Sequence, residues 1–144
     1  MVTKGGWVLL ALKVAPLDRI RLMKALFLFW WRYQGEIPEY FKFEPYLYGP
    51  YSLEVYSVLD QLLDAGLIMQ LPHSMQQYAE YYLTRRGDIE AAKVEQNVDS
   101  GMLEKLQQVV REVSRLGFNE LLRRVYSEAP EYAAKSLVKD VVLG

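Results

Sequence analysis

Three prolines place the tightest limit on how this chain folds, because proline lacks a backbone donor and fixes φ. Pro38, Pro45 and Pro50 exclude a regular helix over residues 36–52, although helical patterns lie on both sides of that segment. We expect an extended, packed connection that ends in a Gly49-Pro50 turn and leads into a helix. Its aromatic residues favour packing over flexibility: Tyr40, Phe41, Phe43, Tyr46, Tyr48 and Tyr51.

Apolar spacing predicts helices before and after the proline segment. Apolar residues at intervals of three and four predict a helix over about 18–33, with Asp18 as its N-cap. A shorter helix over 7–14 precedes it and stops before a proline. After the segment, the same spacing predicts a helix over about 51–65, closed by Gly66 in the left-handed conformation.

The remaining pattern predicts a β-hairpin and further helices. The expected elements are a strand over 67–71, a turn over 72–77, a strand over 78–83, helices over 89–94, 102–116 and 119–126, and a final helix or docked tail over 133–143. Three helices, a hairpin and a helix, in this order, predict an α+β, mostly α fold with a winged helix-turn-helix-like core. We assign residues 1–96 to this core and 97–144 to a C-terminal helical extension packed on it, within a single domain.

Composition narrows the chemistry. With 51% hydrophobic and 24% charged residues, the chain is typical of one soluble globular domain. It has no cysteine, which excludes disulfides, thiolate zinc sites and cysteine nucleophiles. His73, in an expected turn, is the only histidine, and no segment is apolar enough for a membrane span. We therefore expect a cytoplasmic protein that is not an enzyme, with no catalytic residue, cofactor or metal.

Several strings resemble one protein family. The segment from Phe43 to Ser52, with Gly66-Leu67-Ile68 after it, resembles the core of Panacea-domain proteins, which include SocA-type antitoxins, and of their YwgA-like relatives. Residues 21–27, 82–87 and 121–136 are similar to further segments of that family. The resemblance implies a non-enzymatic protein that neutralises a toxin or another partner by direct contact, or a regulator.

A partner surface is expected from the aromatic segment and the helix after it. Exposed tyrosines are frequent anchors of interfaces, and the helix over 51–65 carries acidic side chains suited to a basic partner. The alternative is that the rings pack one helix on another and the acidic face is merely solvated. In an extended stretch, Tyr46 and Tyr48 share one face. The candidate partner-binding residues are Tyr46, Tyr48, Tyr51, Glu54, Asp60 and Asp64.

The second hypothesis is a dimeric winged-helix transcription regulator that binds DNA. A pI near 5.9 and a net charge of −1 do not favour it, and neither do the carboxylates on the helix expected to read DNA. Five basic residues would bind phosphates if the fold gathered them, and the alternative is that they are solvated. They are Arg19, Arg21, Lys24, Arg85 and Arg86.

Overall fold

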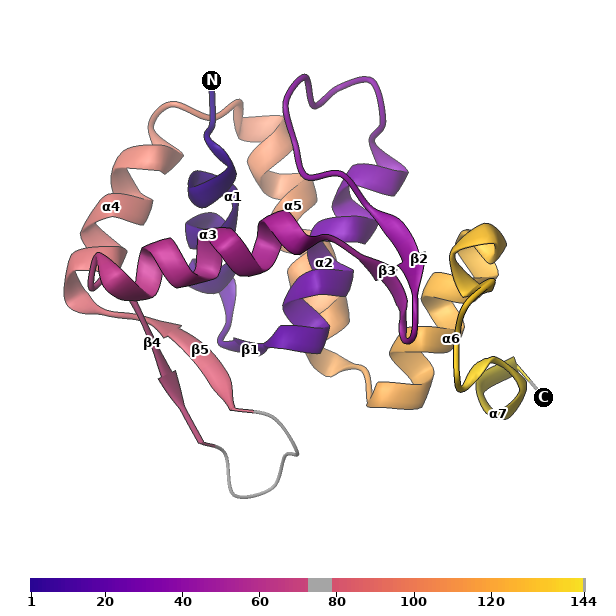
Figure 1. Cartoon of the computed structure of the whole chain (residues 1–144). Coiled ribbons are helices and arrows are strands. Elements are labelled where there is room, and N and C mark those ends of the chain that lie inside the picture. Colours follow the sequence, from indigo (N-terminus) through magenta and orange to yellow (C-terminus); the bar gives the residue numbers. More distant parts are fainter. Residues whose placement is uncertain (73–78, 144) are drawn as a thin grey trace.

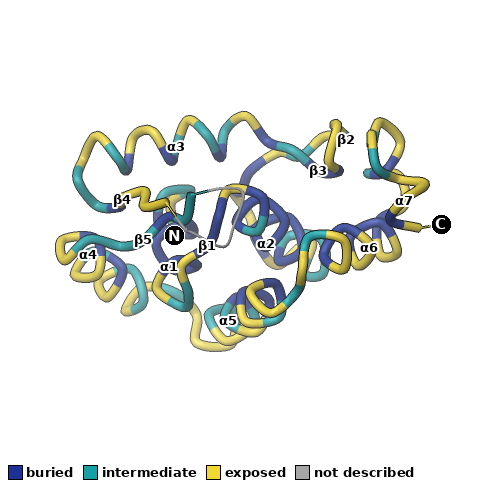
Figure 2. The backbone as a smooth tube through the Cα atoms, turned by 90° about the horizontal axis from the view of Figure 1, so that it is seen from below, coloured by how far each residue is buried: buried dark blue, intermediate teal, exposed yellow. Residues whose placement is uncertain are grey.

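Two buried helices form the centre of the structure, a computed structural model that describes residues 1–72 and 79–143. They are α1 (Lys4–Val14) and α2 (Arg19–Arg32), which lie between the other helices (Figure 1), and most of their residues are buried (Figure 2). A helix that is apolar all round, as α1 is over WVLLAL, has to be enclosed by other elements. The other helices supply that cover.

The outer helices surround this pair. They are α3 (Leu53–Asp64), α4 (Arg85–Glu95), α5 (Ser100–Arg115), α6 (Phe118–Glu128), the short 3₁₀ helix η1 (Pro130–Ala133) and α7 (Lys139–Leu143). In Figure 2, α3 and α5 lie on opposite sides of the central helices. α4 contacts α1, and α5 and α6 contact α2. Of these, α3, α5 and α6 each bury one apolar stripe and expose polar side chains, as amphipathic surface helices do.

A three-stranded antiparallel sheet has the order β1-β5-β4. It consists of β1 (Leu17–Asp18), β4 (Ile68–Leu71) and β5 (Glu80–Leu83). The predicted hairpin is β4 and β5, and Leu17 pairs with Tyr81 to add β1 at its edge. β1 was not predicted, because a two-residue strand has no alternation to detect.

A second hairpin replaces the predicted extended connection. β2 (Glu44–Tyr46) pairs with β3 (Gly49–Tyr51), and Leu47 and Tyr48 form the turn. The predicted Gly49-Pro50 turn is therefore wrong. Pro45 lies opposite Pro50, where the alternation of an antiparallel ladder leaves a pair without hydrogen bonds and tolerates two residues that lack N–H. Gly49 has φ +91°, which permits the tight reversal.

The predicted α+β, mostly helical fold class is confirmed. The predictions differ from the structure mainly in where single helices begin and end. Asp18 caps α2 and Gly66 takes φ +73° after α3, both as predicted. The helix predicted over 89–94 is longer, because the Thr84 side chain accepts a hydrogen bond from the Gly87 N–H and starts α4 at residue 85. Gly117 is the N-cap of α6.

The aromatic segment divides into a buried part and an exposed part. Tyr40 and Phe41 are buried, and the Tyr40 hydroxyl donates to the Leu26 carbonyl at 2.7 Å. The Phe43 ring meets that of Phe27 edge-on, with centroids 5.3 Å apart. The interpretation that the aromatic rings pack in the core therefore holds for the first half of the segment. The hairpin that follows extends to the surface.

Candidate functional site

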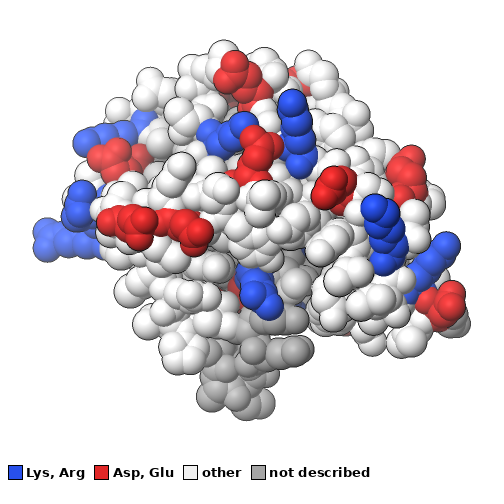
Figure 3. All heavy atoms as spheres, viewed as in Figure 1, with Lys and Arg blue, Asp and Glu red and all other residues white. Residues whose placement is uncertain are grey.

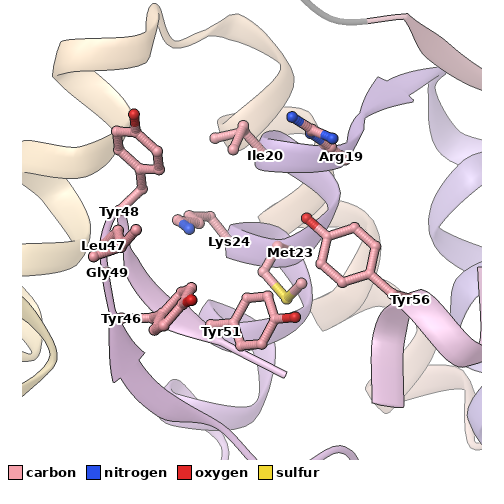
Figure 4. A pocket seen from close by; sticks show the side chains of 10 residues that line it. All are labelled: Arg19, Ile20, Met23, Lys24, Tyr46, Leu47, Tyr48, Gly49, Tyr51 and Tyr56. Carbon is pink, nitrogen blue, oxygen red and sulfur yellow. The ribbon is translucent and has the colours of Figure 1, made fainter. Parts of the chain in front are cut away.

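An open pocket of about 270 Å³ lies between α2, the β2–β3 hairpin and α3 (Figure 4). Each of these elements contributes side chains to its wall. α2 supplies Arg19, Ile20, Met23 and Lys24, the hairpin supplies Tyr46, Leu47, Tyr48 and Tyr51, and α3 supplies Tyr56. The pocket thus joins aromatic and basic side chains that are far apart in the sequence.

Helical spacing places Lys24 at the floor of the pocket. Ile20 and Lys24 are four residues apart and therefore lie on one face of α2, which the hairpin covers. Lys24 is only 3% exposed, and its Nζ donates to the Pro50 carbonyl at 3.2 Å. Burial lowers the pKa of Lys24 from 10.5 to about 7. The buried amine therefore changes charge near neutral pH.

Three tyrosine rings form one wall. The rings of Tyr46 and Tyr51 have centroids 4.8 Å apart, and those of Tyr51 and Tyr56 are 5.6 Å apart. Tyr46 is 45% exposed, and Leu47 and Tyr48 are each 37% exposed at the tip of the hairpin. The wall is thus packed internally while its outer edge is accessible to a partner.

The C-terminal part of the chain supports the hairpin. A Cβ at Gly49 would lie 2.8 Å from the Tyr126 ring, so the turn rests directly on α6. The Tyr126 hydroxyl donates to Ser136 Oγ at 2.7 Å, and the Leu137 N–H donates to the Leu47 carbonyl at 2.9 Å. These contacts set the position of the hairpin relative to α2.

The predicted partner-binding residues form two groups. Tyr46, Tyr48 and Tyr51 all line the pocket, although Tyr46 and Tyr48 do so across a turn and not on one face of an extended strand. Glu54 does not line it: its carboxylate binds Lys4 Nζ and the Lys42 N–H, which lower its pKa. The remaining two acids, Asp60 and Asp64, are exposed further along α3.

The five predicted basic residues are not gathered into one surface. Arg19 and Lys24 line the pocket, whereas Arg21 is held by Asp18 and by the Leu116 carbonyl. Arg85 and Arg86 lie in the first turn of α4, where Arg86 donates to the Ala65 carbonyl at 3.1 Å and lines a different depression. On the face in Figure 3, basic side chains are interspersed with acidic ones. Lys24 is buried, since its helix face turns inward under the hairpin.

Sequence reasoning missed the pocket itself and half of the residues that line it, which are Ile20, Met23, Leu47, Gly49 and Tyr56. The available signal was Lys24, a charged residue within the apolar stripe of its helix. His73 lies outside the described residues. Within residues 1–72 and 79–143, no helix is long and apolar enough to cross a bilayer, and no cluster of acidic or histidine side chains could hold a metal ion.

Comparison with known proteins adds no assignment to this geometry. No protein-family model matches the chain, and no curated protein matches it at a significant level.

Proposed function

We propose that this chain is a non-enzymatic binding protein that acts by direct contact with a protein partner at the β2–β3 hairpin and its pocket. The observation that carries the proposal is the hairpin tip, where Tyr46, Leu47 and Tyr48 are exposed beside an open cavity. Tyrosines next to a pocket are the usual anchors of protein interfaces, since they bury a large area with little loss of side-chain freedom.

The order of elements supports a winged-helix-like core for this protein. α1, β1, α2, α3, β4 and β5 follow one another as in winged-helix domains, with β1 at the edge of the wing sheet. The β2–β3 hairpin is inserted between α2 and α3, where a helix-turn-helix has only a short turn. The proposed contact site, the β2–β3 hairpin, is therefore an addition to the winged-helix-like core and is separate from the helix that would read DNA.

The proposed partner is a toxin or another protein that is neutralised by being bound. This part of the proposal rests on the resemblance of the tyrosine, glycine and proline string to Panacea-type antitoxins, because that string makes up the hairpin. DNA is less favoured as a partner, since Asp60 and Asp64 are exposed on α3 and the basic residues are dispersed.

A photo-cross-linking amino acid at Leu47, introduced in cells of the source organism, tests the site. A matched probe at Leu71 serves as control, because this residue lies on the other hairpin and is 43% exposed. We expect one defined protein adduct from position 47 only. The double substitution Tyr46→Ser and Tyr48→Ser should weaken capture at least roughly tenfold, as loss of two interface anchors does.

The cross-linked partner is then expressed alone and together with this chain. An antitoxin role predicts that the partner arrests growth, and that the wild-type chain restores growth while the double tyrosine variant does not. Equal adducts from positions 47 and 71, or none from either, contradict protein contact at the hairpin. Salt-sensitive binding to a DNA duplex that is lost with Arg85→Ala and Arg86→Ala would support the regulator hypothesis instead.

A further inference from the structure

Lys24 lines the pocket but has no role in the proposed contact between the hairpin tyrosines and a partner. Its ammonium has three donors, and among the described residues the only bond it makes is the one to the Pro50 carbonyl. No described carboxylate forms an ion pair with it, and burial is the sole cause of its lowered pKa. A buried amine without a counterion is costly, so residues of this kind are frequent at functional sites.

Among the described residues that line the cavity, the charged groups are all basic. The titratable groups facing it are Arg19 and Lys24 from α2, Tyr46, Tyr48 and Tyr51 from the hairpin, and Tyr56 from α3. None of them is a carboxylate. Figure 4 shows the Lys24 amine directed into the space between α2 and the hairpin. The cavity is therefore basic at its floor and aromatic along its wall.

We infer that the pocket recognises a carboxylate, which binds the Lys24 ammonium while the tyrosine wall packs against the group that carries it. This inference rests on the proposed function in one respect: the carboxylate belongs to an acidic side chain or to the chain end of the protein partner. Inside a cavity, a charge-assisted bond between an ammonium and a carboxylate is stronger than one in water.

The geometry favours a carboxylate over a phosphate. Phosphate sites usually combine several backbone N–H groups at a helix N-terminus or a glycine-rich loop. Here the Asp18 carboxylate already caps the N-terminus of α2, and Lys24 lies in the middle of that helix. One ammonium at the end of a 270 Å³ cavity suits a singly charged group on an aromatic or short aliphatic carrier.

Small carboxylates test the inference with the full chain. Benzoate, the neutral isostere benzamide and inorganic phosphate are titrated into ¹⁵N-labelled protein, and amide shifts of pocket residues are followed by NMR. We expect saturable shifts with benzoate and affinities at least about tenfold lower for benzamide and phosphate. Lys24→Met should reduce benzoate affinity by a similar factor. Lys93→Met, which removes an exposed lysine from α4, should leave it unchanged.

The affinity for benzoate should also depend on pH. Because the ammonium form of Lys24 binds, and its pKa is about 7, affinity should fall roughly 10- to 100-fold between pH 6 and pH 9. In the Lys24→Met variant this fall should disappear. Two further probes identify the source of the carboxylate. N-acetylphenylalanine, compared with its amide, represents a chain end, and the α-amide of N-acetylglutamate represents an acidic side chain.

Equal binding of benzoate and benzamide, stronger binding of phosphate, or undiminished binding by Lys24→Met would overturn the inference. Absence of any saturable shift would do the same. These outcomes are separate from those of the cross-linking experiment. Lys24-dependent binding of benzoate without a specific adduct at Leu47 would support the carboxylate site and contradict the protein partner. A specific adduct at Leu47 without binding of benzoate would support the protein partner and contradict the carboxylate site.

Discussion

Replacing Lys24 with methionine is expected to stabilise the fold, in a way that depends on pH. Methionine keeps nearly the same length and volume while removing the ammonium buried beneath the hairpin. A lowered pKa in the folded state means that folding disfavours the charged form. The resulting cost is complete below pH 7 and fades as the pH rises toward 10.5.

The size of the effect follows from the pKa. A shift of the Lys24 pKa from 10.5 to about 7 corresponds to roughly 4–5 kcal/mol at pH 6 and about 2 kcal/mol at pH 9. Methionine also leaves the Pro50 carbonyl without its donor, which costs about 1 kcal/mol. We therefore expect Lys24→Met to raise the free energy of unfolding by about 3–4 kcal/mol at pH 6 and by about 1 kcal/mol at pH 9.

Urea denaturation of both proteins at several pH values measures this difference directly. Titration of other groups cancels in the comparison, because the two chains differ at one position only. A gain that stays constant from pH 6 to pH 9 would show that the Lys24 amine does not change charge in the pocket. A variant less stable than wild type at every pH would show that the amine has a partner and that its burial is compensated.

Two further substitutions test contacts in other parts of the fold. Glu112→Gln should lower the free energy of unfolding by about 1–3 kcal/mol at pH 7, because Glu112 accepts two hydrogen bonds from Arg32 at 2.9 Å. Since these bonds hold the pKa of Glu112 at about 2 instead of 4.5, the stabilisation is complete above pH 4.5 and is lost as the pH falls toward 2. Urea titrations at pH 7 and pH 3 measure it, and an equal difference at both would contradict the ion pair. Gly87→Ala should destabilise the fold by about 3 kcal/mol, because its Cβ would lie 1.8 Å from the Leu67 carbonyl oxygen. Thermal unfolding compares it with Gly5→Ala, where the nearest atom is 3.7 Å away and a change below about 1 kcal/mol is expected; similar shifts for both would refute the close contact.

The helices could be predicted from the sequence because their signals are local. Asp18 provides the N-cap of α2, and Gly66 provides the left-handed end of α3. Within each helix, the apolar spacing defines the buried stripe. The hairpin of β2 and β3 was missed, since three prolines predicted an extended connection without paired strands. Their placement opposite each other, which makes a ladder compatible with proline, depends on the register between two segments.

The pocket could be predicted only in part, because it is a product of tertiary packing. The sequence indicated Tyr46, Tyr48 and Tyr51 as contact residues, and all three line the cavity. It also treated Lys24 as a surface charge, since lysine is rarely buried. Only the approach of the hairpin to α2 encloses this residue, and no local pattern in either segment reports that approach.

The support of the hairpin by the end of the chain has a consequence for the timing of synthesis. Residues 19–56 contain every side chain of the pocket. The contacts that fix the turn, from Tyr126 beneath Gly49 and from Leu137 to Leu47, require residues that the ribosome adds well after these. A nascent chain therefore exposes the tyrosines before it can hold them in place, and the binding site matures only once residue 137 has been made.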